Sequence, residues 1–201
     1  MVIVFSAESD FPEETVLVRR LFEAGLERFH LRKPLATSEV LRSYLEQIPH
    51  EFHPRIVVHQ HHALTNDFAL GGIHFPEKDR ENAYLTNGIR NPALIYSTGA
   101  HSIGVVKQLQ ADFDLLFLSP VFPSISKSGY APAEMLSIAG NPEINPEKIV
   151  ALGGIDLRRL ESCRENGFQH IALLGAIWQN AAPIATFTEI QEKWLKSNPI
   201  A

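Results

Sequence analysis

Short apolar segments alternate along the chain with segments in which apolar residues recur every three or four positions. The first pattern is typical of buried strands and the second of amphipathic helices. Leu17, Leu21 and Ala24, for example, share one helical face after the apolar run Val2–Ala7, and Gly25 is suited to end that helix. Eight strands are predicted in this way: Val2–Ala7, Arg28–Arg32, Arg55–His59, Ile73–Phe75, Ala93–Ser97, Asp114–Leu118, Ile149–Leu152 and His170–Leu174.

The alternation of strands and helices predicts an α/β fold with a parallel sheet. Eight repeats of about 25 residues each fit a (β/α)₈ TIM barrel, which we expect to occupy residues 1–201 as one domain. An open doubly wound sheet is the alternative, and the lack of a Gly-x-Gly-x-x-Gly motif after the first strand disfavours it. Thr37 or Ser38 is expected to cap the second helix, and Leu157–Asn166 is expected to form the seventh. The stretch Ser119–Ile144 lacks periodicity, which is typical of a long functional loop.

The amino-acid composition of the chain excludes some classes of protein. Hydrophobic residues make up 45% of the chain and charged residues 20%, an ordinary globular balance. The net charge of −5, with both signs interspersed, argues against a nucleic-acid partner, and no apolar run has the length of a membrane span. The single cysteine, Cys163, cannot form an internal disulfide, so we expect a cytoplasmic protein in which Cys163 is a buried helix residue. The sequence leaves open whether the chain forms a homo-oligomer.

Candidate chemistry follows the predicted strands, because a TIM barrel places its active site at the C-terminal ends of its strands. Polar and charged side chains gather there. Those singled out are His30, Arg32 and Lys33 on the second strand, His59 and Gln60 on the third, His74 and Asp79 on the fourth, His101 on the fifth, and Ser124, Ser126 and Lys127 after the sixth.

Glycines follow the last two strands. Gly153 and Gly154 come after the seventh strand and Gly175 after the eighth, where barrels commonly bind phosphate through backbone N–H groups. A tight turn without ligand explains the Gly-Gly pair equally well. Because Arg32 and Lys127 are expected at the same mouth, where cations suit phosphate, we favour a phosphate site.

Four histidines, His30, His59, His74 and His101, are expected at four neighbouring strands. Imidazoles near one another bind transition metals or serve as acid and base near neutral pH. No His-x-x-x-His or carboxylate-bearing metal spacing accompanies them. We therefore favour structural or substrate-contacting histidines over a metal site.

Four segments, His30–Lys33, Gly72–Asp79, Ser119–Lys127 and Ala151–Ile155, resemble thiamine-phosphate synthase and the related TenI-type thiazole tautomerases. The resemblance extends from about Val2 to Trp178. It implies an enzyme that joins hydroxymethylpyrimidine diphosphate to thiazole phosphate and releases pyrophosphate with the help of Mg²⁺. Such a reaction requires no protein nucleophile, and no Ser-His-Asp or Cys-His arrangement is evident.

The resemblance also assigns roles to residues. Arg32 would bind the diphosphate, Asp79 would hold Mg²⁺, and Gly153 and Gly154, with the Gly175 loop, would bind the thiazole phosphate. Ser124, Ser126 and Lys127 would contact phosphate oxygens, with Lys127 also on the departing diphosphate. The remaining substrate-binding candidates are His30, Lys33, His59, Gln60 and His74.

The chain departs from the synthase pattern chiefly on the diphosphate side. The family shows Gln-x-Arg-x-Lys where this chain has His30–Pro34, and Asn-Asp where it has His59-Gln60. A serine expected after the fifth strand falls near Gly99, and the tautomerase histidine falls at Pro120. Two alternatives to a synthase follow: a thiazole-phosphate tautomerase that uses His101 or His74, and a non-catalytic binder of thiazole phosphate or thiamine phosphate.

Overall fold

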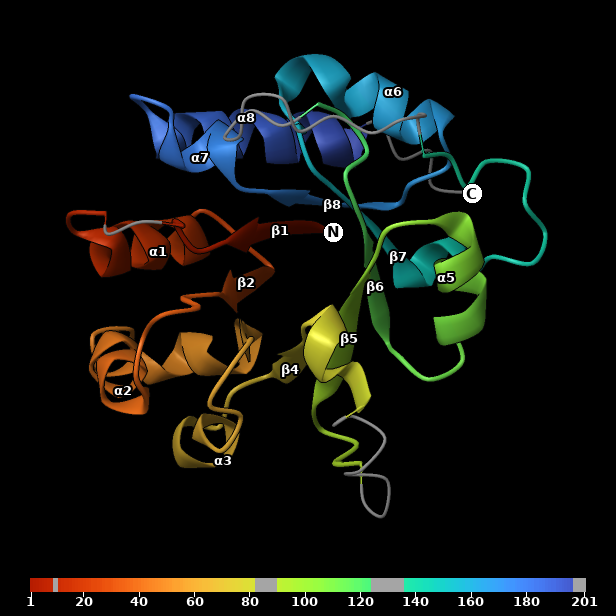
Figure 1. The fold of residues 1–201 in the computed structure, drawn as a ribbon. Helices are drawn as coiled ribbons and strands as arrows, with labels where there is room; N and C mark the ends of the chain where they lie inside the picture. The colour runs from red at the N-terminus through yellow and green to blue at the C-terminus, as the bar shows by residue number, and fades with distance from the viewer. Residues whose placement is uncertain (9–10, 82–89, 124–135, 197–201) are drawn as a thin grey trace.

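The protein is a TIM barrel, as predicted. The computed structural model describes residues 1–8, 11–81, 90–123 and 136–196, and its eight parallel strands form a closed ring in which each strand pairs with the next (Figure 1). Pairing of β8 with β1 closes the ring and excludes the open doubly wound sheet. The strands are β1 (Val2–Phe5), β2 (Arg28–Leu31), β3 (Ile56–Val58), β4 (Gly72–Phe75), β5 (Ile95–Ala100), β6 (Leu115–Leu118), β7 (Ile149–Leu152) and β8 (His170–Leu173).

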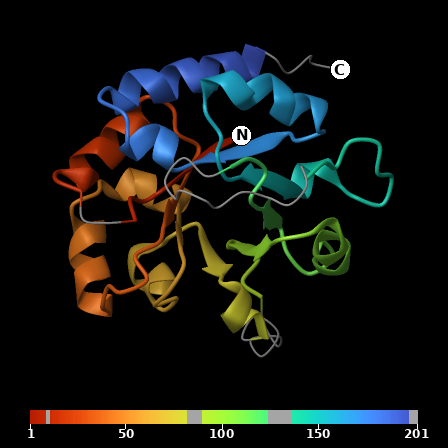
Figure 2. The same cartoon turned by 45° about the horizontal axis from the view of Figure 1, so that its top comes forward.

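Helices surround the ring of strands, and Figures 1 and 2 show them on its outer side. Within the described residues, none of these helices has the length and apolar character needed to cross a membrane. The α-helices are α1 (Glu14–Glu23), α2 (Ser38–Glu46), α3 (Leu64–Phe68), α5 (Ile103–Leu109), α6 (Leu160–Glu165), α7 (Gly175–Trp178) and α8 (Pro183–Lys196). Short 3₁₀ helices are η1 (His50–Arg55), η2 (Glu77–Asp79), η3 (Pro146–Lys148) and η4 (Leu157–Arg159).

Local side-chain bonds set several element ends. Thr37 caps α2, because its hydroxyl accepts a hydrogen bond from the Val40 N–H. Gly25 follows α1 with a φ of +95°, as expected of a glycine at a helix C-terminus. The helix predicted over Leu157–Asn166 begins as η4, where the Asp156 carboxylate accepts from the Arg158 N–H, and continues as α6.

The predicted position of the fifth strand, Ala93–Ser97, is wrong by several residues. The Asn91 side chain accepts a hydrogen bond from the Ala93 N–H at 3.0 Å, and this turn delays the start of β5 to Ile95. The strand then continues to Ala100, which is in register with Leu118 of β6. This shift places Ser97 inside the barrel instead of at its mouth.

The barrel interior has an apolar side and a polar side. Six apolar side chains from β1, β6, β7 and β8 form a cluster separate from the main core: Ile3, Phe5, Leu115, Phe117, Val150 and Ala172. On β2, β4 and β5, the buried residues His30, His74 and Ser97 take part in polar contacts instead. The two sides meet where the His30 ring packs against the Phe5 and Phe117 rings, with centroids 5.0 and 4.7 Å apart.

The loops after β1 and β2 are joined by a buried ion pair. The Lys33 ammonium lies 2.6 Å from the Glu14 carboxylate, and only 15% of the Lys33 side chain and 6% of the Glu14 side chain are exposed. Glu14 also accepts from the Ala7 N–H, and Lys33 donates to the Ala7 carbonyl at 2.9 Å. Because both charges are paired and bonded to backbone, the pair holds the start of α1 against the end of β2.

Two glycines after β7 allow the loop after β6 to pack closely. Gly153 and Gly154 have φ values of +102° and +64°. A Cβ atom on Gly154 would lie 2.2 Å from the Pro123 carbonyl oxygen. The Val121 N–H donates to the Leu152 carbonyl and the Phe122 N–H to the Gly153 carbonyl, so backbone bonds tie the two loops together.

This packing predicts that Gly154→Ala destabilises the protein more than Gly140→Ala. Gly140 has nearly the same φ, +68°, but no atom lies within 4 Å of the position that a Cβ would take there. Both variants carry the left-handed backbone cost of about 1–2 kcal/mol, and only Gly154→Ala adds a clash. Urea unfolding followed by circular dichroism should give a clearly larger loss of unfolding free energy for Gly154→Ala. Equal losses would contradict close packing at this turn.

Candidate active site

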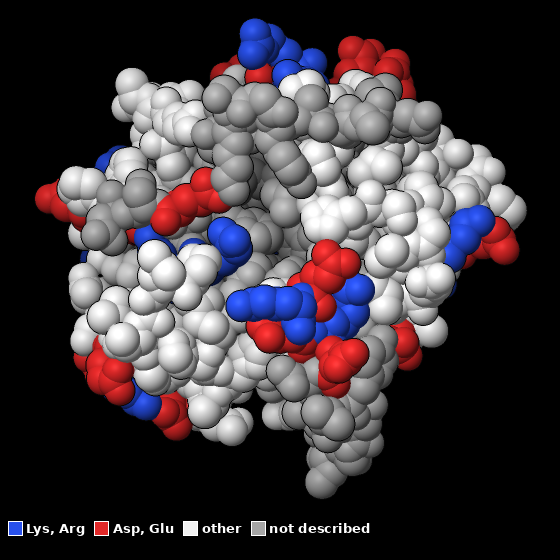
Figure 3. Space-filling model, in the orientation of Figure 1, with Lys and Arg blue, Asp and Glu red and all other residues white. Residues whose placement is uncertain are grey.

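A cavity of about 460 Å³ opens at the C-terminal mouth of the barrel. Figure 3 shows a hollow on this face, with acidic and basic side chains next to each other along its edge. All eight strands, or the loops that follow them, contribute to its wall. The lining residues are Phe5, Glu8, Arg32, His59, His74, Pro76, Glu77, Gly99, His101, Phe117, Ser119, Pro120, Leu152, Gly153, Gly154, Ile155, Ala172, Leu174 and Gly175.

The cavity brings together many of the residues that the sequence singled out. Those on its wall are Arg32, His59, His74, His101, Gly153, Gly154 and Gly175. His30, Lys33, Gln60 and Asp79 are not on the wall. Ser124, Ser126 and Lys127 lie outside the described residues, so their predicted phosphate contacts stay predictions.

Arg32 offers the cavity an available positive charge. Its backbone is fixed, because the Arg32 N–H donates to the buried Ser6 hydroxyl at 2.8 Å and that hydroxyl donates to the Arg32 carbonyl at 2.9 Å. Its side chain is 42% exposed, and the guanidinium lies 3.8 Å from the Glu8 carboxylate. A contact of this length between partly exposed groups is weak, so an anionic ligand can compete with Glu8 for the guanidinium.

Lys33 and Gln60 do not line the cavity and are bonded to the loops around it. Lys33 is held by Glu14, as described above, since a buried carboxylate requires a nearby cation. The Gln60 side-chain amide donates to the Lys33 carbonyl. Both side chains therefore hold the loops of the rim together, and their substrate contacts stay predictions.

Asp79, the predicted Mg²⁺ ligand, lies in η2 but off the cavity wall. Two other carboxylates reach the wall, and each already has a cationic or histidine neighbour: Glu8 has Arg32, and Glu77 has Arg80 at 3.9 Å and His101 at 3.6 Å. Mg²⁺ binds through oxygen ligands in near-octahedral geometry. The described residues bring no three carboxylates together, so Mg²⁺ here would need one or two carboxylates together with the substrate phosphates, as is usual for this ion.

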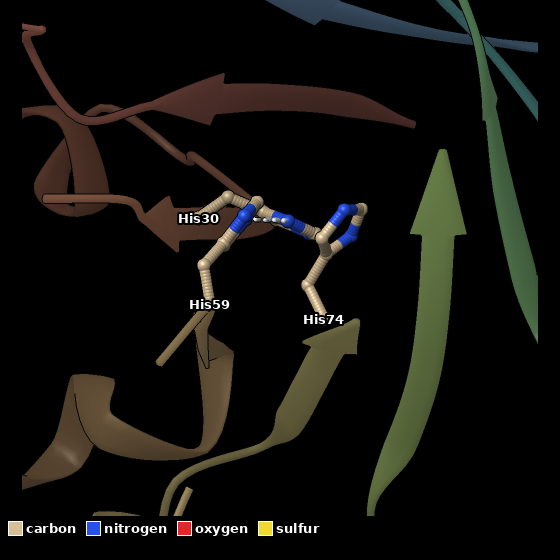
Figure 4. A group of neighbouring side chains, drawn as sticks. All are labelled: His30, His59 and His74. Atoms are coloured by element: carbon tan, nitrogen blue, oxygen red, sulfur yellow. Dashed lines mark hydrogen bonds between the residues drawn. The ribbon is translucent and has the colours of Figure 1, made fainter. Parts of the chain in front are cut away.

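Three of the four predicted histidines form a cluster on the cavity floor (Figure 4). The His30 Nδ1 and His59 Nε2 atoms lie 3.1 Å apart, a hydrogen bond between two buried rings. The His59 and His74 rings stack with centroids 4.0 Å apart, and His74 Nδ1 lies 3.0 Å from the Ser97 hydroxyl oxygen. His59 and His74 reach the cavity wall, whereas His30 is fully buried.

Burial keeps these three rings neutral. It lowers the pKa of His30 and of His59 well below the ordinary value, and the neighbouring His74 adds to both shifts. Burial, together with the nearby charge of Arg32, lowers the pKa of His74 to about 3. Neutral imidazoles have a free nitrogen lone pair, so they act as hydrogen-bond acceptors or metal ligands at physiological pH.

His101 stands apart from the cluster that the sequence expected it to join. Its side chain is 52% exposed, its Nδ1 lies 2.7 Å from the Ser119 carbonyl oxygen, and its Nε2 lies near Glu77. His101 follows the end of β5, whereas His30 and His74 are within their strands and point into the barrel. The separation of His101 from the other three therefore reflects its place on the rim.

Several wall residues were not singled out from the sequence. Glu8 and Glu77 follow β1 and β4, and the rule that marked Arg32 and His59 applies to them equally. Phe5 and Phe117 are strand residues that the sequence pattern does not distinguish from outward-facing core residues, because both faces of a parallel barrel strand are apolar.

Known proteins with similar sequences and structures are consistent with a phosphate-binding barrel. The family model described as thiamine monophosphate synthase matches residues 1–177. A thiamine-phosphate synthase from Cronobacter sakazakii is 28% identical over 170 residues, which cover 81% of this chain and 80% of the relative. A second, from Staphylococcus haemolyticus, is 25% identical over 169 residues, which cover 80% of this chain and 79% of the relative.

Among solved structures, a thiamine phosphate pyrophosphorylase from Bacteroides thetaiotaomicron is similar, with a TM-score of 0.79 and 30% sequence identity. The similarity covers 98% of both chains. The family match spans most of the sequence, and the predicted resemblance is confirmed. The chain therefore belongs to the thiamine monophosphate synthase family.

Proposed function

We propose that this protein is a thiamine-phosphate synthase, which joins hydroxymethylpyrimidine diphosphate to thiazole phosphate and releases pyrophosphate. One observation carries the proposal: Arg32 and the glycines Gly153, Gly154 and Gly175 line the same cavity. The cavity thus offers a cationic side chain and, separately, glycine backbone that a ligand can approach closely. Two anion-binding regions in one cavity suit two substrates that each carry phosphate.

Arg32 is placed to assist departure of the diphosphate. In the proposed reaction the bond between the pyrimidine methylene carbon and the diphosphate oxygen breaks, and negative charge builds on that oxygen. A guanidinium stabilises such charge through paired N–H donors. The thiazole nitrogen supplies the electron pair for the new carbon–nitrogen bond, so no protein nucleophile takes part.

The burial of Cys163 is consistent with a reaction that uses no protein nucleophile. It is fully buried in α6, as the sequence predicts, and burial raises the pKa of its thiol to about 12. A thiol with this pKa holds almost no thiolate at neutral pH and does not act as a nucleophile.

The glycine side of the cavity suits the thiazole phosphate. Gly153, Gly154 and Gly175 line the cavity and have no side chain between the backbone and a ligand. The apolar Leu152, Ile155 and Leu174 on the same part of the wall suit the ring of the substrate.

The tautomerase alternative is supported by a different observation: His74 and His101 both line the cavity, and imidazoles are the side chains that most often transfer protons in enzymes. The position that corresponds to the tautomerase histidine is Pro120, which has no acid–base group. A tautomerase would therefore depend on His74 or His101, and a non-catalytic binder would depend on neither.

The first experiment mixes purified protein with both substrates, in the presence of Mg²⁺ and in parallel with EDTA. We expect thiamine phosphate and pyrophosphate to form in equal amounts with Mg²⁺. An active synthase assayed in parallel is the control. Absence of product would reject the synthase; thiazole isomerisation that persists in EDTA would instead support the tautomerase, and tight thiazole-phosphate binding without turnover would support a binder.

The second experiment tests Arg32. Arg32→Gln should weaken pyrophosphate binding by about 10- to 100-fold, because a hydrogen bond to a charged group contributes about 1.5–3 kcal/mol. Isothermal titration calorimetry measures the Kd directly, and the KM for the diphosphate substrate should rise in parallel. Arg42→Gln is the matched control, since Arg42 pairs with Asp67 on the exposed outer surface. Similar pyrophosphate affinity in both variants would remove Arg32 from the diphosphate site.

A further inference from the structure

The histidine cluster has metal-binding geometry that the proposed reaction does not use. Each of His30, His59 and His74 offers one ring nitrogen, and the three nitrogens lie within 4.8 Å of one another. The rings come from β2, the residue after β3, and β4, so three adjacent strands direct them to one point (Figure 4). Positions on paired strands are rigidly held, which suits a preorganised ligand set.

Hydrogen bonds set the proton position on His74. The Ser97 hydroxyl oxygen lies 3.0 Å from His74 Nδ1 and 3.4 Å from the Ile73 carbonyl oxygen. When the hydroxyl donates to that carbonyl, it accepts from the His74 Nδ1–H, and in this tautomer His74 Nε2 carries a free lone pair. A metal-bound histidine typically donates its other ring N–H to an oxygen acceptor, which orients the ring and fixes the tautomer.

His30 Nδ1 and His59 Nε2 face each other and share one proton across 3.1 Å. Each neutral imidazole has one N–H and one lone pair. When the donor ring carries its N–H on the far nitrogen instead, both facing nitrogens present lone pairs, and one cation can take the place of the shared proton.

We propose that His30, His59 and His74 bind one divalent transition-metal ion, of the Zn²⁺ or Co²⁺ type, on the floor of the cavity. Imidazole nitrogens suit these ions, whereas Mg²⁺ requires oxygen ligands. Metal–nitrogen bonds of about 2.0–2.1 Å place tetrahedral ligand atoms about 3.4 Å apart. The 3.1 Å separation of His30 and His59 is close to that value, and ring rotation of His74 brings in the third nitrogen.

The position of the cluster leaves one side of the ion open. His59 and His74 reach the cavity wall, while Phe5 and Phe117 pack against the rings within the barrel. Three protein ligands and an open fourth position are the arrangement of a catalytic rather than a structural zinc site. Arg32 lies on the same wall, so an anion is favoured as the fourth ligand. This proposal does not depend on synthase activity, and its test uses no substrate.

The test is a metal titration of the untagged protein, first treated with a chelator that is then removed. Co²⁺ is added while its visible d–d absorption is recorded, and Zn²⁺ is then added as a competitor. We expect one Co²⁺ per chain, displacement by Zn²⁺, and no displacement by excess Mg²⁺. Failure to bind either ion at a stoichiometry of one would overturn the proposal, as would displacement by Mg²⁺.

Variants locate the ion. His59→Asn and His74→Asn should each weaken Co²⁺ binding at least tenfold, and Ser97→Ala should weaken it by about 10- to 100-fold because the orientation of His74 is lost. His61→Asn is the control, since His61 is exposed on the same side and asparagine tolerates its φ of +54°. Circular dichroism melting verifies folding of each variant, and Ser97→Ala removes only a hydroxyl. Retention of full affinity in His59→Asn and His74→Asn would place the ion elsewhere and refute the site.

Discussion

Buried imidazoles inside a closed barrel must satisfy their nitrogens without bulk water, and this constraint organises the centre of the molecule. Burying a polar group without a partner costs free energy. Contacts between neighbouring strands and their ends meet part of this constraint, His30 to His59 and His74 to Ser97, whereas His30 Nε2 has no partner among the described residues. These bonds fix the ring orientations, and the rings form the floor of the cavity. The polar and apolar sides of the interior, and hence the shape of the site above them, depend on this arrangement.

The cavity combines two surfaces of different character. From β7 and β8 it receives the glycine turn and apolar side chains, a surface that suits a phosphate and a ring. From β2 to β5 it receives Arg32, the neutral histidines and Glu77, and Glu8 joins them from the loop after β1. The departures from the family pattern lie on this second surface. Imidazole nitrogens gather on this surface, and the proposed transition-metal site would use them.

Much of the fold followed from the sequence because barrel strands are short, apolar and regularly spaced. Seven strand positions needed only small changes at their ends. The fifth was displaced because a side-chain bond from Asn91 delays it, and such bonds leave no periodic signal. The same displacement moves Ser97 from the predicted end of the strand to its interior, where it contacts His74. In a TIM barrel the active site lies at the C-terminal ends of the strands. This rule depends on topology alone, and it correctly placed Arg32, His59 and Gly153 at the mouth of the barrel.

The direction of individual side chains was harder to predict, because it depends on partners distant in the sequence. Lys33 was expected in the site, but Glu14 is buried 19 positions earlier and pairs with it. Asp79 was expected to hold a metal; it lies in the 3₁₀ turn η2 and does not line the cavity, and its metal contact stays a prediction. The meeting of His30, His59 and His74 likewise depends on the strand register, which no local motif encodes.

We propose that one cavity binds a phosphorylated ligand through the glycine turn and Arg32. Calorimetric titration with thiamine phosphate and, in parallel, with thiamine tests it most directly, since the two differ only in the phosphate. The account predicts that thiamine phosphate binds at least tenfold more tightly, because charge-assisted hydrogen bonds contribute about 1.5–3 kcal/mol each. Equal affinity for the two compounds, or binding of neither, would contradict it.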